Sequence, residues 1–207
     1  MSPLPSQMAN RWESRVEPKA GQGKLYWHIL FNDQPQVRAL ASAAQERLAG
    51  FPGLHFTPKQ WLHMTTMTVG FSEDFTATET SQMIILTRGL LSRLSPITVT
   101  FGRVLYHSEA IALGVNPPGA VNPVLDAVRE ATGNVIGSER TTKGQAWVPH
   151  VTVAYSTARQ PASPIIAALG HELPKCEATI DGVNLIIQDG PERLWDWRSV
   201  AKITLGS

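Results

Sequence analysis

The sequence predicts a fold of alternating strands and helices that occurs twice, in two similar halves. The first observation is a pair of His-x-Thr triplets, His63-Met64-Thr65 and His150-Val151-Thr152, each inside an apolar run typical of a β-strand. The second is the order of the predicted elements, which is strand-helix-strand-helix-strand in both halves. The third is a matching distance, because Leu25 precedes His63 by 38 residues and Ala112 precedes His150 by the same 38. Together these observations indicate an internal duplication.

The first half contains three predicted strands and two predicted helices, each with a local signal. The elements are a strand at 24–31, a helix at 35–49, the strand carrying His63, a helix at 77–94 and a strand at 97–106. In the first helix, apolar side chains recur at helical spacing. Pro35 suits its first turn, and Gly50 can end it.

The second half repeats this order. The elements are a strand at Ala110–Val115, a helix from Asn122 to about Thr132, the strand carrying His150, a short helix at 163–170, a strand at 177–188 and a last strand at Leu194–Leu205. Asn122 is expected at the helix cap, with Pro123 at the first helical position and Gly133 after the helix. A loop rich in Gly, Ser and Thr is expected across 133–146.

We expect the chain to consist of an N-terminal arm followed by one folded domain. Residues 1–23 are polar and irregular and are expected to form a mobile arm or an extension along the surface. Residues 24–207 are expected to form a single domain with two lobes, whose repeats span about 24–106 and 109–205.

The composition narrows the classes of function. The formal net charge is +1 in 207 residues, without the basic stripe of a protein that grips long nucleic-acid duplexes. The one cysteine, Cys176, excludes a disulfide framework and a cysteine-rich metal site. No apolar run is long enough for a membrane span or a secretory signal. We therefore expect a cytoplasmic monomer with no membrane contact and no evident protein partner.

The two triplets present chemistry suited to phosphodiesters. Residues two apart on a strand point to the same face, so each triplet directs one imidazole and one hydroxyl the same way. If the triplets face each other, His63 and His150 supply a general base and a general acid near neutral pH. Thr65 and Thr152 can then donate hydrogen bonds to phosphate oxygens. Neither triplet has an Asp or Glu within five residues, so we expect no metal and no other cofactor.

On these residues the chain resembles the 2H phosphoesterase superfamily, also called the 2′-5′ RNA ligase-like family. Its signature is two His-x-Thr/Ser motifs, one in each half of a duplicated α+β fold, and the resemblance covers most of residues 24–205. It implies two lobes, a central cleft lined by two antiparallel sheets, and helices outside. It also implies metal-independent chemistry on 2′,3′-cyclic phosphates, 2′-5′ phosphodiesters or related nucleotides. Many members carry an Arg shortly after the second motif, where this chain has Tyr155.

Further residues are candidates for substrate binding. Tyr26 and His28 share a face of the first strand and can line the cleft, and Tyr155 can donate to phosphate. The alternative is that His28 is satisfied by a neighbour and Tyr155 covers the core. Trp195 and Trp197 are expected to pack in the core or cover an apolar edge. The basic loop residues are Lys59, Arg140 and Lys143, which either attract an anion or are simply solvated.

The sequence therefore predicts a phosphodiesterase acting on a nucleotide or an RNA end. Two alternatives stay open. One is a module that binds a nucleotide or RNA end without turnover. The other is an enzyme of the same chemistry whose substrate is a cyclic phosphate other than RNA, or a signalling nucleotide.

Overall fold

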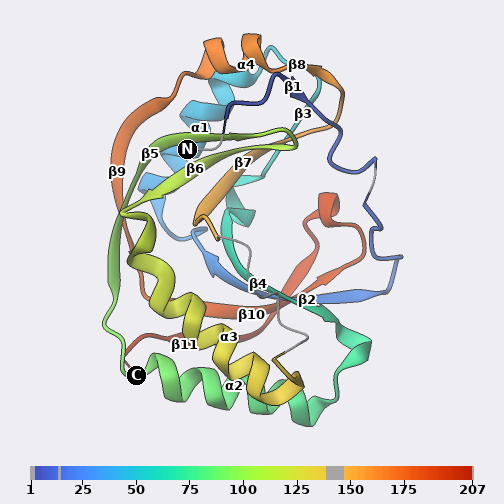
Figure 1. Cartoon of the computed structure of the whole chain (residues 1–207), viewed down its shortest axis with the longest axis vertical. Coiled ribbons are helices and arrows are strands. Elements are labelled where there is room, and N and C mark those ends of the chain that lie inside the picture. Colours follow the sequence, from blue (N-terminus) through green and yellow to red (C-terminus); the bar gives the residue numbers. More distant parts are fainter. Residues whose placement is uncertain (1–2, 14, 139–146, 207) are drawn as a thin grey trace.

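The computed structural model describes residues 3–13, 15–138 and 147–206 and contains two main antiparallel sheets with helices outside (Figure 1). The strands are β1 (Gln7–Met8), β2 (Gly23–Leu30), β3 (Leu54–Phe56), β4 (His63–Phe71), β5 (Ile97–His107), β6 (Ala110–Asn116), β7 (His150–Ser156), β8 (Gln160–Pro161), β9 (Glu172–Ile180), β10 (Gly182–Asp189) and β11 (Trp197–Thr204). The helices are α1 (Pro35–Leu48), α2 (Ala77–Leu91), α3 (Asn122–Ile136) and α4 (Ala162–Leu169). Among the described residues, no helix is long and apolar enough to cross a membrane.

The two sheets have equivalent strand orders. The first is β11-β10-β2-β4, with α2 packed on β11 and α3 on β4. The second is β3-β7-β6-β5-β9, with α1 packed on β7 and β9, and α4 against α1. Without its edge strand β3, the second sheet reads β9-β5-β6-β7, so that β7 ends this sheet as β4 ends the first. Each histidine strand pairs with the first long strand of its half, β4 with β2 and β7 with β6. The predicted α+β fold with two antiparallel sheets and outer helices is confirmed.

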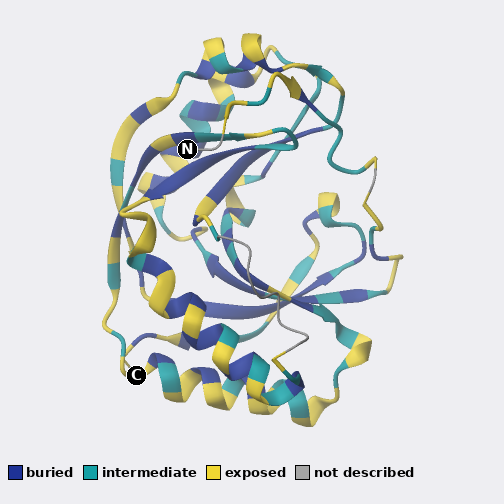
Figure 2. Ribbon diagram, in the orientation of Figure 1, coloured by how far each residue is buried: buried dark blue, intermediate teal, exposed yellow. Residues whose placement is uncertain are grey.

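The core lies between each sheet and its helices. Buried residues follow the strands and the inner faces of the helices, whereas exposed residues lie on the outer helix faces (Figure 2). Trp27 of β2 is fully buried, and its Nε1 donates to Thr132 Oγ1 of α3 at 3.1 Å. This bond satisfies the indole N–H without water and fixes α3 on the first sheet.

Two helices begin as their sequences dictate. Pro35 occupies the start of α1, as predicted. At the start of α2, the backbone N–H of Glu79 donates to Thr76 Oγ1 at 3.2 Å, and that of Thr76 donates to Glu79 Oε2 at 2.8 Å. This capping box satisfies two N–H groups that the helix itself leaves unpaired.

The strand predicted at 177–188 is wrong, because this stretch contains parts of two strands in different sheets. β9 ends at Ile180 in the second sheet, and β10 begins at Gly182 in the first. A Cβ at Gly182 would lie 2.5 Å from the backbone oxygen of Ile203, so only glycine fits this close crossing. Only Asp181 separates the two strands, and β10 is buried along nearly its whole length whereas β9 alternates between buried and exposed residues near its end.

The ends of three other elements also differ from the prediction. α3 starts at Asn122 as a helical residue, passes through Gly133 and ends before Gly137, whose φ of 88° favours glycine. α2 ends at Leu91, before the predicted 94. The last strand starts at Trp197 and not at Leu194, because a 3₁₀ turn (Glu192–Leu194) and a left-handed Trp195 come first.

The N-terminal arm lies along the second sheet before it reaches β2 (Figure 1). Its strand β1 pairs with β8, and Met8 is almost fully buried. Further along, the backbone N–H of Ala9 donates to Ser108 O at 2.7 Å, and that of Arg11 donates to Ser156 O at 2.9 Å. These bonds place Arg11 beside the end of β7.

Candidate active site

His63 and His150 occupy equivalent places, at the first residues of β4 and β7. Nδ1 of each ring lies 2.7 Å from the carbonyl oxygen two residues earlier, that of Trp61 or Val148. Since a carbonyl only accepts, Nδ1 carries a proton in both rings. Within the described residues, no hydrogen bond engages Nε2 of either ring. The backbone thus fixes both imidazoles in the tautomer whose Nε2 can accept a proton.

The two motifs lie together although their strands belong to different sheets. β4 and β7 are in contact, and Trp147, just before the second motif, donates from Nε1 to Thr65 O at 3.0 Å. Burial is the main cause of the lowered pKa of His63, and the charge of a protonated His150 lowers it further. The structure therefore brings together the two halves of the predicted catalytic set.

His63 is surrounded by rings. His28 stacks on it with centroids 4.2 Å apart, and Trp197 and Trp195 meet it edge-on at 4.8 and 6.1 Å. Burial among these groups lowers the pKa of His63 to about 4, although the bond to Trp61 opposes the shift. The His63 imidazole is consequently neutral near neutral pH.

His150 is more accessible, and its side chain reaches solvent. Its pKa is also lowered, first by the protein groups that flank the ring and then by the positive charges of Arg11 and His107. The bond to Val148 acts in the opposite direction. The two histidines thus share a geometry but differ in exposure, and an asymmetry of this kind can separate a base from an acid.

Thr65 is supported by His28. Its Oγ1 lies 3.1 Å from His28 Nε2, while Nδ1 of the buried His28 has no hydrogen-bond partner in the described structure. Burial and the charge of His63 hold the pKa of His28 well below its usual range, so the ring is neutral. A proton on Nε2 avoids a buried, unpaired N–H at Nδ1. In that tautomer His28 donates to Thr65, whose own O–H is then free to donate.

Thr152 and Tyr155, three residues apart on β7, are both buried. Burial raises the pKa of Tyr155, and the Thr152 side chain acts in the opposite direction. Tyr155 also packs against Trp195, with centroids 5.8 Å apart. A polar side chain therefore lies near each motif threonine, His28 of β2 near Thr65 and Tyr155 of β7 near Thr152.

The remaining candidates lie at different distances from the histidines. Tyr26 lies next to His28, with ring centroids 5.2 Å apart, so the shared face predicted for them is confirmed. Lys59 is exposed in the 3₁₀ turn before β4, and no contact with a motif residue is present in the described structure. Arg140 and Lys143 lie outside the described residues.

Three residues at the site were not predicted there. Trp195 and Trp197 form the wall beside His63, and Trp195 has a φ of 57°, which is unusual for a bulky residue and is associated with functional sites. Arg11 of the arm lies over the Tyr155 ring, 4.2 Å from its centroid. The alternation of the two Trp gave a partial signal, but nothing in the arm distinguished Arg11.

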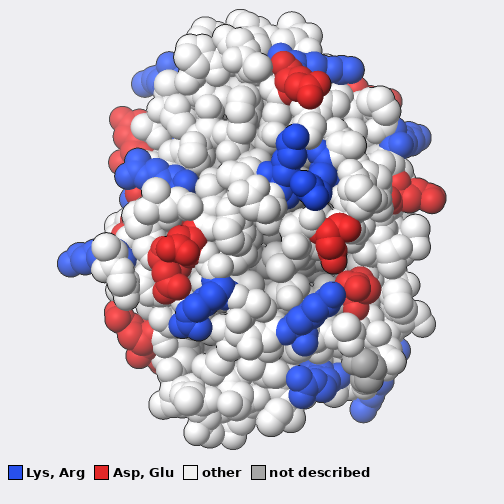
Figure 3. All heavy atoms as spheres, turned by 180° about the vertical axis from the view of Figure 1, so that it is seen from behind, with Lys and Arg blue, Asp and Glu red and all other residues white. Residues whose placement is uncertain are grey.

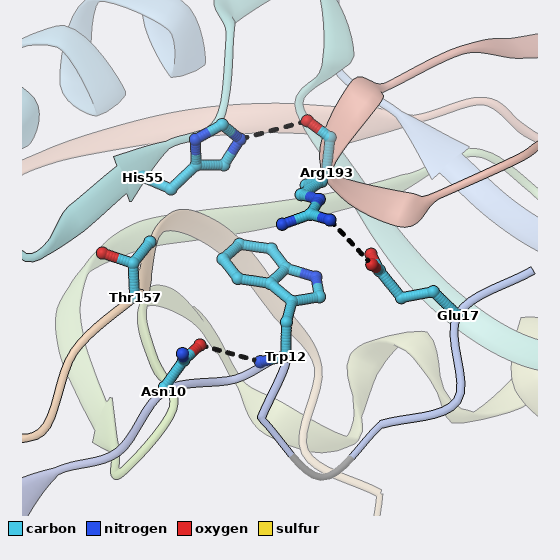
Figure 4. A pocket seen from close by; sticks show the side chains of 6 residues that line it. All are labelled: Asn10, Trp12, Glu17, His55, Thr157 and Arg193. Atoms are coloured by element: carbon cyan, nitrogen blue, oxygen red, sulfur yellow. Dashed lines mark hydrogen bonds and ion pairs between the residues drawn. The ribbon is translucent and has the colours of Figure 1, made fainter.

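A cavity of about 370 Å³ lies beside this site (Figure 4). It is lined by Asn10, Trp12, Glu17, His55, Thr157 and Arg193. The His55 ring connects it to the site, because Trp195 Nε1 donates to His55 Nε2 at 3.2 Å. None of the four motif residues lines the cavity.

On the face seen from behind the view of Figure 1, Lys and Arg side chains are interspersed with Asp and Glu side chains (Figure 3). Within the described residues, acidic partners hold several of the basic side chains, among them Arg11, Arg15 and Arg193. This mixture of charges differs from the basic stripe of a protein that grips a long nucleic-acid duplex.

Fold and paired motifs together define a class of proteins that act on phosphoesters. The chain belongs to the 2′-5′ RNA ligase superfamily, whose family model matches residues 31–192. The resemblance to the 2H phosphoesterases is therefore confirmed, and membership implies a phosphoesterase or ligase activity. No curated protein matched the sequence.

Solved structures share the fold at low sequence identity. TT0787 of Thermus thermophilus is 18% identical with a TM-score of 0.68, covering 89% of this chain and 98% of that one. E. coli LigT complexed with 3′-AMP is 15% identical with a TM-score of 0.64, covering 91% and 100%. The MHV ns2 PDE domain is 13% identical with a TM-score of 0.54, covering 87% and 98%.

Proposed function

We propose that this protein is a metal-independent phosphodiesterase acting on a 2′,3′-cyclic phosphate or a 2′-5′ phosphodiester of a nucleotide or RNA end. The observation that carries the proposal is the matched pair His63 and His150. Both rings are anchored through Nδ1 to a backbone carbonyl, which leaves Nε2 for proton exchange. Two such groups suffice to move the protons that hydrolysis of a phosphodiester requires.

In the proposed reaction His63 is the general base and His150 the general acid. Nε2 of neutral His63 takes a proton from water, whose oxygen bonds to phosphorus. The bond from phosphorus to one ribose oxygen breaks, and that oxygen takes the proton of His150. The assignment follows the larger fall in pKa at His63 and the greater exposure of His150. Thr65 and Thr152 donate to the phosphate oxygens as negative charge develops.

The nucleotide character of the substrate is supported by relatives. Structures of E. coli LigT contain 3′-AMP, ATP or NADP⁺. The net charge of +1 and the mixed surface charge favour a free nucleotide or a short end over a long strand.

The test is product formation in excess EDTA from 2′,3′-cyclic nucleotides, 2′-5′-linked dinucleotides and an RNA oligomer with the same cyclic end. We expect turnover of at least one substrate, and a free nucleotide to match or exceed the oligomer in kcat/KM. Loss of all turnover in EDTA, with recovery on adding a divalent metal, would contradict the mechanism. Tight nucleotide binding without product would favour the binding module.

The proposed roles also predict an acid-shifted pH profile. For a phosphodiester, which does not titrate in this range, kcat/KM should form a bell. It falls below about pH 4 as His63 gains a proton, and it falls on the alkaline side as His150 loses its proton below its ordinary pKa of ~6.5. The optimum should therefore lie below pH 6.5. Circular dichroism at each pH checks folding, and a kcat/KM still rising above pH 7 would refute this prediction.

A further inference from the structure

Arg11 is held at the site by an arm that precedes the matched family segment, which begins at residue 31. Its backbone is bonded to Ser156, the residue after Tyr155, and its side chain is only 14% exposed. An arginine side chain is rarely buried to this degree unless it is paired with other groups.

The partners of Arg11 leave part of the guanidinium unused. Nε and Nη2 donate to the two carboxylate oxygens of Glu192 at 3.1 and 2.9 Å. Nη1 lies 3.6 Å from Glu109 Oε2, within ion-pair distance but outside hydrogen-bond distance. Guanidinium carries five N–H donors. Within the described residues, both protons of Nη1 and one of Nη2 have no hydrogen-bond acceptor.

The guanidinium that carries these donors lies against β7, the strand of the second motif. It is stacked over Tyr155, which follows Thr152 by three residues, with 4.2 Å from the guanidinium carbon to the ring centroid. Its charge also reaches both His63 and His150 and lowers the pKa of each. A cation in this place stabilises an anion that lies between the two histidines, because electrostatic interactions are strong in a partly desolvated cleft.

We infer that Arg11 is a substrate-binding residue, contributed by the N-terminal arm, whose free Nη1 and Nη2 protons contact the phosphate oxygens of the substrate. The inference deepens the proposed function and rests on it for the position of the phosphate. Arginine suits this task because its planar fork donates two parallel hydrogen bonds to phosphate.

A purely structural role for Arg11 makes a different prediction. If the Arg11–Glu192 pair only fastens the arm to the loop before Trp195, removing either partner should have the same consequence. If Arg11 binds phosphate, removing Glu192 leaves the guanidinium with more free donors and no competing carboxylate. Removing Arg11 should then weaken anion binding, whereas removing the Glu192 carboxylate should strengthen it.

The test is calorimetric binding of inorganic phosphate to wild type, Arg11→Met, Glu192→Gln and Arg15→Met. Arg15 is the matched control because it lies on the same arm and pairs with Glu109, but its side chain is 46% exposed. We expect the Kd of Arg11→Met to rise about 10- to 100-fold, as for loss of a charge-assisted hydrogen bond. Glu192→Gln should bind more tightly than wild type, and Arg15→Met should change Kd less than threefold.

Activity separates this inference from the proposed function. Arg11→Met should raise KM and lower kcat/KM while its melting temperature stays near that of Arg15→Met. Equal phosphate Kd and kcat/KM in Arg11→Met and Arg15→Met would overturn the inference while turnover by wild type upholds the proposed function. If phosphate binding depends on Arg11 but wild type turns over no phosphodiester, the inference about Arg11 is upheld and the proposed function is overturned. Parallel losses in Arg11→Met and Glu192→Gln would establish the structural role.

Discussion

Replacing His63 or His150 with alanine should each lower kcat/KM by about 10²- to 10⁴-fold, the range expected for loss of one general acid or base. Both imidazoles are anchored by the backbone, so alanine removes the proton-transfer group without removing a support of the fold. His171→Ala is the matched control, because this histidine packs edge-on against Tyr106 in another part of the molecule.

The two losses should differ when the leaving group needs no proton. A nucleoside p-nitrophenyl phosphodiester releases a stable phenolate, so it bypasses the general acid but still requires water to be activated. We expect His150→Ala to recover most of its activity with this substrate and His63→Ala to recover little. Recovery in His63→Ala alone would reverse the two roles, and no recovery in either variant would exclude the proposed separation of acid from base.

Local pattern was sufficient to predict the histidine strands. The alternation in β4 and β7 places His63 with Thr65 and His150 with Thr152, because successive side chains on a strand point to opposite faces. The repeated element order predicted two equivalent sheets but not their composition, because β5 of the first half lies in the second sheet and β10 and β11 of the second half lie in the first. Pattern failed at Asp181, the single residue between β9 and β10, where the close approach of Gly182 to β11 marks the crossing.

The contacts around the histidines depend on residues far apart in the chain. Arg11 meets Glu192 across 181 positions, and Trp195 reaches His63 from the other end of the sequence. Such contacts arise from the folded topology and leave no periodicity in either segment. Alternation placed Trp195 and Trp197 on one strand face, whereas the left-handed Trp195 precedes the strand and both rings meet His63. The environment that sets the pKa of His63 was therefore not predictable from the triplet itself.

The motif hydroxyls should contribute a second large effect. Thr65→Val and Thr152→Val keep the shape of the side chain but remove the donor, and we expect each to lower kcat by about 10²-fold, as for loss of one donor to a developing oxyanion. Thr65→Ser should retain most of the activity. Thr66→Val is the matched control, because the Thr66 hydroxyl donates to Trp27 O at 2.9 Å in the core.

Stability measurements separate the catalytic effect of Thr65 from its structural one. Valine at 65 also leaves His28 Nε2 without its partner, which should cost about 1–3 kcal/mol of unfolding free energy. Thr66→Val loses a buried hydrogen bond of similar kind, so both variants should be destabilised in urea, but only Thr65→Val should lose kcat. If Thr66→Val lost as much kcat as Thr65→Val, the loss would reflect disturbance of β4. The hydroxyl of Thr65 would then have no direct part in binding the phosphate.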